Sequence, residues 1–262
     1  MSMTPNEIEI AAELLCSAHD NHRQLVPSVL LNTRPPGSID EAYAIQDAVA
    51  QRRWMEKGGR THAWKTGAPN NETAPYAAPI PPNVVYDSPA QLASSRFHII
   101  GIEAELAYRF SCDLPPRDAA YTAEEIIDAV EGVYVAIEVV DTRLKDWQQA
   151  GKLWQLADNQ INGALVMGSG RSDWNCMDPL GQSVELLVDG ELFMTKQGSH
   201  PMGDPRPLVT WIANHCAGRN GGIKAGDIVT TGSWTGLEFI EPGSHVVARF
   251  PGVGEAVVTF PS

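Results

Sequence analysis

Apolar residues recur at helical spacing through the N-terminal part of the chain. The stretch TPNE at residues 4–7 is typical of a capping box with proline at the first helical position, and apolar residues follow at positions 8, 11, 12 and 15. A second helix is expected to begin at Ser38 and to end at the glycines of positions 58 and 59. The composition NTRPPG predicts a loop between them. The sequence therefore predicts a small, mostly helical N-terminal domain over residues 1–60.

Beyond residue 60, short apolar and alternating runs predict mainly strands. HAWKTGAP (62–69) is expected to form a short strand that runs into a turn. Residues 69–82, PNNETAPYAAPIPP, contain so many prolines that no regular structure is expected there. Further strands are expected at 84–87, 98–110, 133–141, 164–168, 183–190, 191–198, 227–236, 245–250 and 255–260, and helices at 122–132, 146–156 and 204–218.

The order of these elements indicates the fold class. Helices come first, and the strands that follow do not alternate regularly with helices as they do in a doubly wound fold. We therefore expect an α+β protein with mainly antiparallel sheets, in which residues 61–262 form one β-rich domain.

The charge of the chain narrows its possible partners. Its 262 residues include 19 Lys and Arg against 32 Asp and Glu, which gives a formal net charge of -13. A surface of this sign repels phosphate backbones and anionic lipids, so neither nucleic acid nor a membrane is expected as a partner. An anionic substrate would need a local cation, supplied by the protein or by a metal.

Sequence features that report on the compartment are sparse. The first residues, MSMTPNEIEI, lack the basic and apolar regions of a secretory signal, and no apolar run approaches the length of a membrane span. The four cysteines lie far apart and form no CxxC pair. They are expected to be reduced thiols, which favours a cytoplasmic protein.

Three glutamates lie in otherwise apolar strands. Glu103 and Glu105 stand two residues apart in GIEAELAYRF, so they point to the same face of a strand, and Glu138 lies within VAIEVVD. Carboxylates held this close repel one another unless a cation lies between them. The set is typical of a site for a hard divalent cation, Mg²⁺ or Mn²⁺. The alternative is that these glutamates lie on an exposed sheet face or pair with basic residues.

A lysine precedes the proline-rich segment. Lys65 lies in WKTG, where it could bind a substrate carboxylate or transfer a proton, although a solvated lysine at a strand end has the same pattern. His62, three residues earlier, could reach the same cleft or lie on the surface. No dinucleotide fingerprint and no GxSxG elbow is present.

Two polar, glycine-bearing loops adjoin predicted strands. They are DNQING (158–163) and TTGSWTG (230–236). Either loop could present amide, hydroxyl or backbone N–H groups to a substrate oxygen, and either could be a simple turn. The candidate substrate-binding side chains are Asn162, Thr231 and Ser233, together with Lys65.

Several of these segments together resemble one known family. They are SIDEAYAIQDAV, WKTG, GIEAELAY, VAIEVVDTR, LADNQINGALVMG, DPRPLVTWIAN and IKAGDIVTTGSWTG, in this order over most of the chain. The chain thereby resembles the 2-keto-4-pentenoate hydratase family, which includes 2-oxohept-4-ene-1,7-dioate hydratases and 4-oxalocrotonate decarboxylases. That family belongs to the fumarylacetoacetate hydrolase superfamily.

The resemblance implies a fold and a site. The fold would be a mixed β-sandwich roll, carrying the catalytic site, with a small helical N-terminal domain. Glu103, Glu105 and Glu138 would be the metal ligands and Lys65 the site lysine. The family commonly has an aspartate in the loop after this lysine, whereas here that loop is rewritten as PNNETAPYAAPIPP. Glu72 of this loop and His62 are therefore our candidates for the residues that transfer protons.

The resemblance also implies an activity. It is a metal-dependent hydratase that adds water to a 2-hydroxy-2,4-dienoate through an enolate, giving a 4-hydroxy-2-oxo acid in the catabolism of aromatic or related compounds. The alternatives are a 2-oxo diacid decarboxylase, an acylpyruvate C–C hydrolase and a non-catalytic partner subunit. The expected partners are a small 2-oxo or 2-hydroxy acid, further copies of the chain in a homo-oligomer, and another enzyme of the same pathway.

Overall fold

The structure is a computed structural model that describes residues 2–262. Its helices are α1 (Pro5–Asp20), α2 (Pro27–Leu31), α3 (Ile39–Ala50), α4 (Ala123–Ala129), α5 (Lys152–Ala157) and α6 (Arg206–Arg219), with a π-helical turn at Gln51–Met55 and 3₁₀ turns at Pro82–Val84, Ser94–Arg96, Asn159–Ile161 and Trp174–Cys176. Its strands are β1 (Ala63–Gly67), β2 (Tyr76–Ile80), β3 (Val85–Asp87), β4 (Ala90–Gln91), β5 (Gly101–Phe110), β6 (Val130–Val140), β7 (Asn162–Arg171), β8 (Ser183–Val188), β9 (Glu191–Gln197), β10 (Ile228–Ser233), β11 (Glu238–Phe239), β12 (His245–Phe250) and β13 (Gly254–Thr259).

The N-terminal helices begin where the sequence predicts. The hydroxyl of Thr4 accepts a hydrogen bond from the backbone N–H of Glu7, and the Glu7 carboxylate accepts one from the backbone N–H of Thr4, which completes the capping box. Ser38 caps α3 in the same way. The second helix then ends in the π-helical turn, at Met55, slightly earlier than expected.

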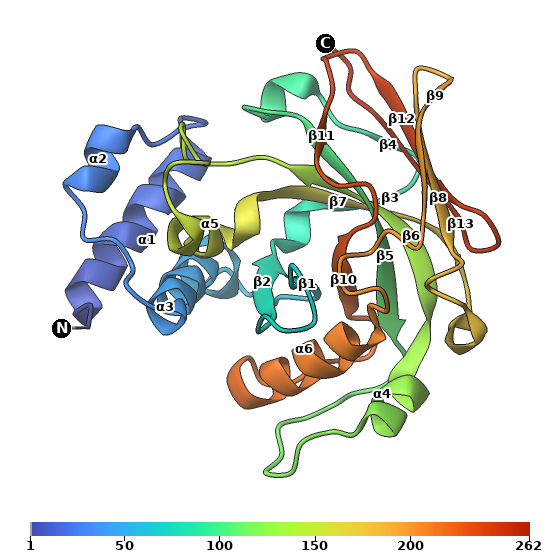
Figure 1. Cartoon of the computed structure of the whole chain (residues 1–262). Coiled ribbons are helices and arrows are strands. Elements are labelled where there is room, and N and C mark those ends of the chain that lie inside the picture. The colour runs from blue at the N-terminus through green and yellow to red at the C-terminus, as the bar shows by residue number, and fades with distance from the viewer. Residues whose placement is uncertain (1) are drawn as a thin grey trace.

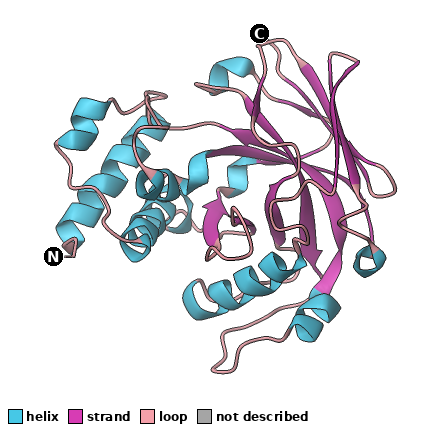
Figure 2. Ribbon diagram, in the orientation of Figure 1, coloured by secondary structure: helices cyan, strands magenta, loops and turns pink. Residues whose placement is uncertain are grey.

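Two curved sheets form the body of the protein, and the helices lie outside them (Figures 1 and 2). One sheet has the order β2-β1-β10-β5-β6-β7-β3, with β11 beside β5, and the other has the order β4-β13-β12-β8-β9. Most pairs are antiparallel, and the parallel ones are β1–β10, β3–β7 and β4–β13. The expected α+β class and sandwich-like roll are confirmed.

The two sheets come into close contact where β7 packs against β13. A Cβ atom at Gly168 would lie 2.2 Å from the carbonyl oxygen of Glu255, so a larger residue at this position would push the sheets apart. On the other side of the larger sheet, α6 packs against β1 and β10 (Figure 1). The larger sheet is therefore covered on both faces, which explains why buried positions outnumber exposed ones in β5 and β6.

The prediction that residues 69–82 contain no regular structure was wrong. Tyr76–Ile80 forms β2, which pairs antiparallel with β1 and places Pro79 opposite Trp64. Proline is tolerated in β2 because this strand lies at the edge of its sheet, where one side of the backbone needs no partner. Only the stretch between the two strands is irregular.

Three helix boundaries also differ from expectation. The predicted helix stop at Gly132 lies inside β6, where a Cβ atom would be 2.7 Å from the carbonyl oxygen of Arg171. That glycine permits close packing against β7 and has no role in ending α4. Residues 146–150 form turns, and the helix expected there is confined to α5. Gly218 lies within α6, which continues to Arg219.

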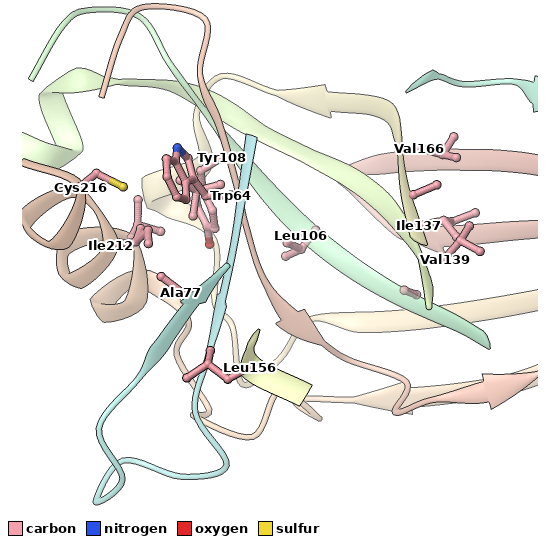
Figure 3. Close-up of a cluster of buried hydrophobic side chains, with 14 of the residues drawn as sticks. Trp64, Ala77, Leu106, Tyr108, Ile137, Val139, Leu156, Val166, Ile212 and Cys216 are labelled. Atoms are coloured by element: carbon pink, nitrogen blue, oxygen red, sulfur yellow. The ribbon is translucent and has the colours of Figure 1, made fainter. Parts of the chain in front are cut away.

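One hydrophobic core joins the N-terminal helices to the β body. Buried residues of α1 and α3 belong to the same cluster as those of the sheets. Figure 3 shows Trp64 and Tyr108 beside Ile212 and Cys216 of α6, with Ile137 and Val139 farther along the same core. The buried amide of Gln46 in α3 donates hydrogen bonds to backbone carbonyls of β2 and α5. The domain boundary at residue 60 stays a prediction. Among residues 2–262, no helix is long and apolar enough to cross a membrane.

Candidate metal centre and substrate cavity

The three glutamates of the sequence pattern meet at one point of the larger sheet. Glu103 of β5 lies directly opposite Glu138 of β6 in the antiparallel register, and Glu105 lies two residues farther along the same face of β5. Each carboxylate offers an oxygen atom that lies within 4.8 Å of the other two. Pairing of neighbouring strands thus converts a short motif and a distant residue into a compact cluster.

Two of these carboxylates are fully buried and held by the protein. Glu105 accepts hydrogen bonds from the hydroxyl of Thr230 and from the backbone N–H of Gly232 at 3.1 Å. Glu138 accepts bonds from Lys65 Nζ at 2.5 Å and Asn162 Nδ2 at 2.9 Å, both on Oε1. Its other oxygen, Oε2, is buried without a hydrogen-bond partner among the described residues.

The electrostatics of the cluster favour an added cation. Burial raises the pKa of Glu103 to about 7, and the charge of Glu138 raises it further while Lys65 opposes the shift. Burial also raises the pKa of Glu105 well above its usual range. Three carboxylates and one ammonium leave two negative charges uncompensated when all are ionised. An oxygen-liganded divalent cation matches both this charge and the free Oε2 of Glu138.

Lys65 is a buried, protonated ammonium. Burial alone would lower its pKa, but the adjacent Glu138 carboxylate outweighs that effect and raises the pKa above its usual value. Besides its bond to Glu138, Nζ donates to the backbone carbonyl of Gln160 at 3.1 Å. Lys65 therefore joins β1 to β6 and to the turn that precedes β7.

That turn has an unusual backbone. Asn159, Gln160 and Ile161 all have left-handed φ angles, of 51°, 52° and 54°. Consecutive non-glycine residues in this region are strained by about 1–2 kcal/mol each. A buried ion pair holds the turn, since Arg143 Nε lies 2.5 Å from Asp158 Oδ1 and the same guanidinium donates to the carbonyls of residues 158 and 162.

A cavity of about 740 Å³ opens over the cluster. Its walls come from the β1–β2 loop, α5, the end of β9 with the following segment, and the loop after β10, and Glu103 is the carboxylate exposed in it. Tyr76 also lines the cavity, and burial raises its pKa to about 12, so it is a neutral phenol at physiological pH.

His200 lines the same cavity but has both ring nitrogens engaged. Nδ1 accepts a hydrogen bond from the backbone N–H of Met202 at 3.2 Å, so Nε2 carries the proton and donates to the carbonyl of Thr231 at 2.9 Å. Burial lowers the pKa of the ring, which agrees with the neutral form. His200 therefore fixes the loop after β10 in place and is not free to act as a base.

Comparison with known proteins identifies the family of the chain. The model of the fumarylacetoacetate (FAA) hydrolase C-terminal family matches residues 51–260. The chain belongs to this family.

Its curated relatives in the FAA hydrolase family are enzymes. A 2-keto-4-pentenoate hydratase of Paraburkholderia xenovorans (strain LB400) is 27% identical, with 99% of this chain and 97% of the relative aligned. A 4-oxalocrotonate decarboxylase of Pseudomonas putida is 26% identical, over 93% and 91% of the two chains. Among solved structures, the 4-oxalocrotonate decarboxylase from Pseudomonas putida G7, complexed with magnesium and adipate, has a TM-score of 0.85 at 21% identity and covers 99% of both chains.

The structure brings together only some of the residues that the sequence predicted for the site of this FAA hydrolase family member. Lys65 and the three glutamates meet, and Thr231 and Ser233 line the cavity, where the Ser233 hydroxyl lowers the pKa of Glu103. Asn162 lies behind the cluster and contacts Glu138, outside the cavity lining.

The two nominated proton-transfer residues lie elsewhere. Glu72 is exposed in the β1–β2 loop, and neither its side chain nor His62 lines the cavity. Tyr76 and His200, which do line it, were missed by the sequence analysis. No motif marks them, because each reaches the site only through pairing of β2 with β1 or packing of the segment after β9.

Proposed function

We propose that this chain is a divalent-metal-dependent hydratase. Its substrate would be a 2-hydroxy-2,4-dienoate or the 2-oxo tautomer, and its product a 4-hydroxy-2-oxo acid. The observation that carries the proposal is the cluster of Glu103, Glu105 and Glu138 at one end of a cavity large enough for such an acid. The hydratase named above, which aligns over nearly the whole chain, supports this reaction class.

The three glutamates would hold the cation, Mg²⁺ or Mn²⁺. Their oxygen-only donor set suits these hard ions, and the buried Oε2 of Glu138 provides a ligand atom that no described residue hydrogen-bonds. When bound, the cation supplies Lewis-acid stabilisation for the negative charge that develops on the substrate's 2-oxygen.

The chain's own residues would orient the substrate and move protons. Lys65 holds Glu138 in place and adds a positive charge beside the position of the substrate's carboxylate. Ketonisation of the dienol followed by addition of water requires proton delivery to carbon. Tyr76 is our candidate donor, since its neutral hydroxyl lines the cavity and lies near the charge of Lys65.

The first prediction tests the metal cluster. Glu103→Gln should lower Mg²⁺ affinity and turnover of 2-hydroxypenta-2,4-dienoate by at least about 100-fold, because it removes a ligand charge while keeping the side-chain shape. Calorimetry measures metal binding, loss of dienol absorbance measures turnover, and circular dichroism reports the fold. Glu191→Gln, at an exposed position of β9, is the control and should change none of these. Full activity after removal of metal by chelation would refute the proposal.

The same cluster is compatible with two other reactions. A decarboxylase would release CO₂ from a 2-oxo diacid, as the name of the Pseudomonas putida relative indicates for that protein, and an acylpyruvate hydrolase would release pyruvate. Assays for CO₂ and pyruvate, run beside the dienol assay with Mg²⁺ or Mn²⁺, separate the three. Tight metal binding without turnover of any of these acids would identify a non-catalytic subunit.

A further inference from the structure

The cavity has two cationic side chains that the proposed reaction does not use. Lys152, the first residue of α5, and Lys196, near the end of β9, both line it. Glu103, which belongs to the metal cluster, is the single carboxylate among the described lining residues. The rest of the cavity therefore carries positive charge, in a chain whose net charge is -13.

Neither lysine forms an ion pair with a carboxylate in residues 2–262. Lys196 Nζ donates to the backbone carbonyl of Thr235 at 2.6 Å, which is a neutral partner. Lys152 makes no ion pair or hydrogen bond with any residue of the described part of the chain. Lys65, by contrast, pairs with Glu138 and is buried beside the metal cluster. Lys152 and Lys196 are thus free to pair with an anion that enters from outside.

Short contacts place Lys196 close to the metal cluster. Its Nζ donates to the backbone carbonyl of Thr235, whose hydroxyl lies 3.4 Å from the hydroxyl of Ser233, and the Ser233 hydroxyl is close enough to Glu103 to lower the pKa of that carboxyl. Lys196 and Glu103 therefore line the same cavity and are connected through Thr235 and Ser233. Lys152 stands on the α5 wall, beside Leu153 and Leu156, whose side chains offer apolar contact to the middle of such a molecule.

We infer that the substrate carries a second carboxylate, bound at the outer end of the cavity by Lys196 and Lys152. The inference rests on the proposed function, because it assumes that the first carboxylate lies beside Lys65 and the cation that Glu103, Glu105 and Glu138 would hold. It concerns which acid is selected and leaves open which bond reacts. Both lysines are exposed, so their attraction for a carboxylate is moderate and weakens as salt is added.

A pair of substrates that differ by one carboxylate tests this inference. 2-Hydroxyhepta-2,4-diene-1,7-dioate is 2-hydroxyhexa-2,4-dienoate with a carboxylate added at its last carbon. For the Mg²⁺-loaded protein, kcat/KM should favour the diacid by about tenfold or more. Lys196→Met and Lys152→Met should each reduce this preference severalfold with little change for the monoacid. Lys57→Met removes the same charge at an exposed position outside the cavity lining and should leave the preference unchanged.

A binding measurement makes the result independent of turnover. Adipate is pentanoate with one added carboxylate, and calorimetry should show tighter binding of adipate, with the difference reduced by Lys196→Met and by added salt. Equal handling of both members of each pair, unaffected by the lysine substitutions, would overturn the inference and leave the hydratase proposal standing. If neither dienoate is consumed, the proposed function fails, and the adipate–pentanoate comparison still decides whether the cavity selects a diacid.

Discussion

Single residues behind the cluster control how its carboxylates are presented. Glu105 is only 1% exposed and depends on two donors, the hydroxyl of Thr230 and the backbone N–H of Gly232. Gly232 has a φ of 102°, a conformation that side chains other than glycine's rarely adopt, and β10 is irregular at this point. This irregularity of β10 turns the backbone N–H of Gly232 toward the Glu105 carboxylate. In a regular strand, a backbone N–H at this point would pair with β5.

The Thr230 hydroxyl provides a test at this scale. Thr230→Val keeps the shape of the side chain but removes one donor to Glu105, so Mg²⁺ affinity should fall by about 10-fold to 100-fold, as is typical when a group that orients a ligand is lost. Thr231→Val is the matched control, because that hydroxyl donates to the carbonyl of Leu106 and not to a carboxylate. Equal metal affinities in the two variants would contradict the assignment.

At the scale of elements, the turn before β7 has a strained backbone, and the β6–β7 pairing shifts register beside it, between Val139 and Val140. The left-handed residues of the 3₁₀ turn Asn159–Ile161 aim the carbonyl of Gln160 at Lys65 and place Asn162 against Glu138. The buried Arg143–Asp158 pair fixes this geometry. Strain next to a site persists only where the surrounding structure over-determines the backbone, as it does here.

Substitution of Gln160 separates backbone geometry from side-chain chemistry. Gln160→Val should lower the free energy of unfolding by about 1–2 kcal/mol, because a β-branched residue is disfavoured at a φ of 52°. It should also lower activity, since the carbonyl that contacts Lys65 would shift. Gln160→Asn, which tolerates this conformation, should be close to wild type in thermal and denaturant unfolding. A Val variant as stable as the Asn variant would show that the turn is not strained.

At the scale of the whole molecule, aromatic and charged contacts tie the N-terminal helices to α6. His215 stacks on Trp211 and lies 5.1 Å from the ring of Tyr43 in α3, and Arg219 pairs with Asp47 at 2.7 Å. Burial, and then the charge of Arg219, lower the pKa of His215 to about 4. The imidazole is therefore neutral in the folded protein over most of the accessible pH range.

This shift predicts a pH dependence of stability. Below the usual histidine pKa of about 6.5, the unfolded chain binds a proton that the folded chain does not, so the free energy of unfolding should fall as the pH falls from about 6.5 to about 4. His215→Phe keeps an aromatic ring without the titration, and between about pH 7 and pH 4.5 it should lose about 1–2 kcal/mol less than wild type. Urea unfolding at several pH values measures the difference, and parallel curves would contradict the prediction.

Much of the fold was predictable because its signals are local. The capping box at Thr4, the start of a helix at residue 122, the helical spacing in α1 and the apolar runs of β5 and β6 depend on neighbours in the chain, and all were found. The expected family and fold class are confirmed. β2 was missed because the propensity of proline was overridden by an edge position in the sheet, which no local pattern records.

The sequence by itself determined that Glu103 and Glu105 share a face, because strand geometry is a property of neighbouring residues. It also determined the family, through motifs spread over most of the chain. Only the tertiary structure decided that Glu138 lies opposite Glu103, that Glu72 and His62 lie outside the cavity lining, and that Tyr76, Lys152 and Lys196 line it. These relations depend on strand register and on packing between segments distant in the chain, which spacing along a sequence does not specify.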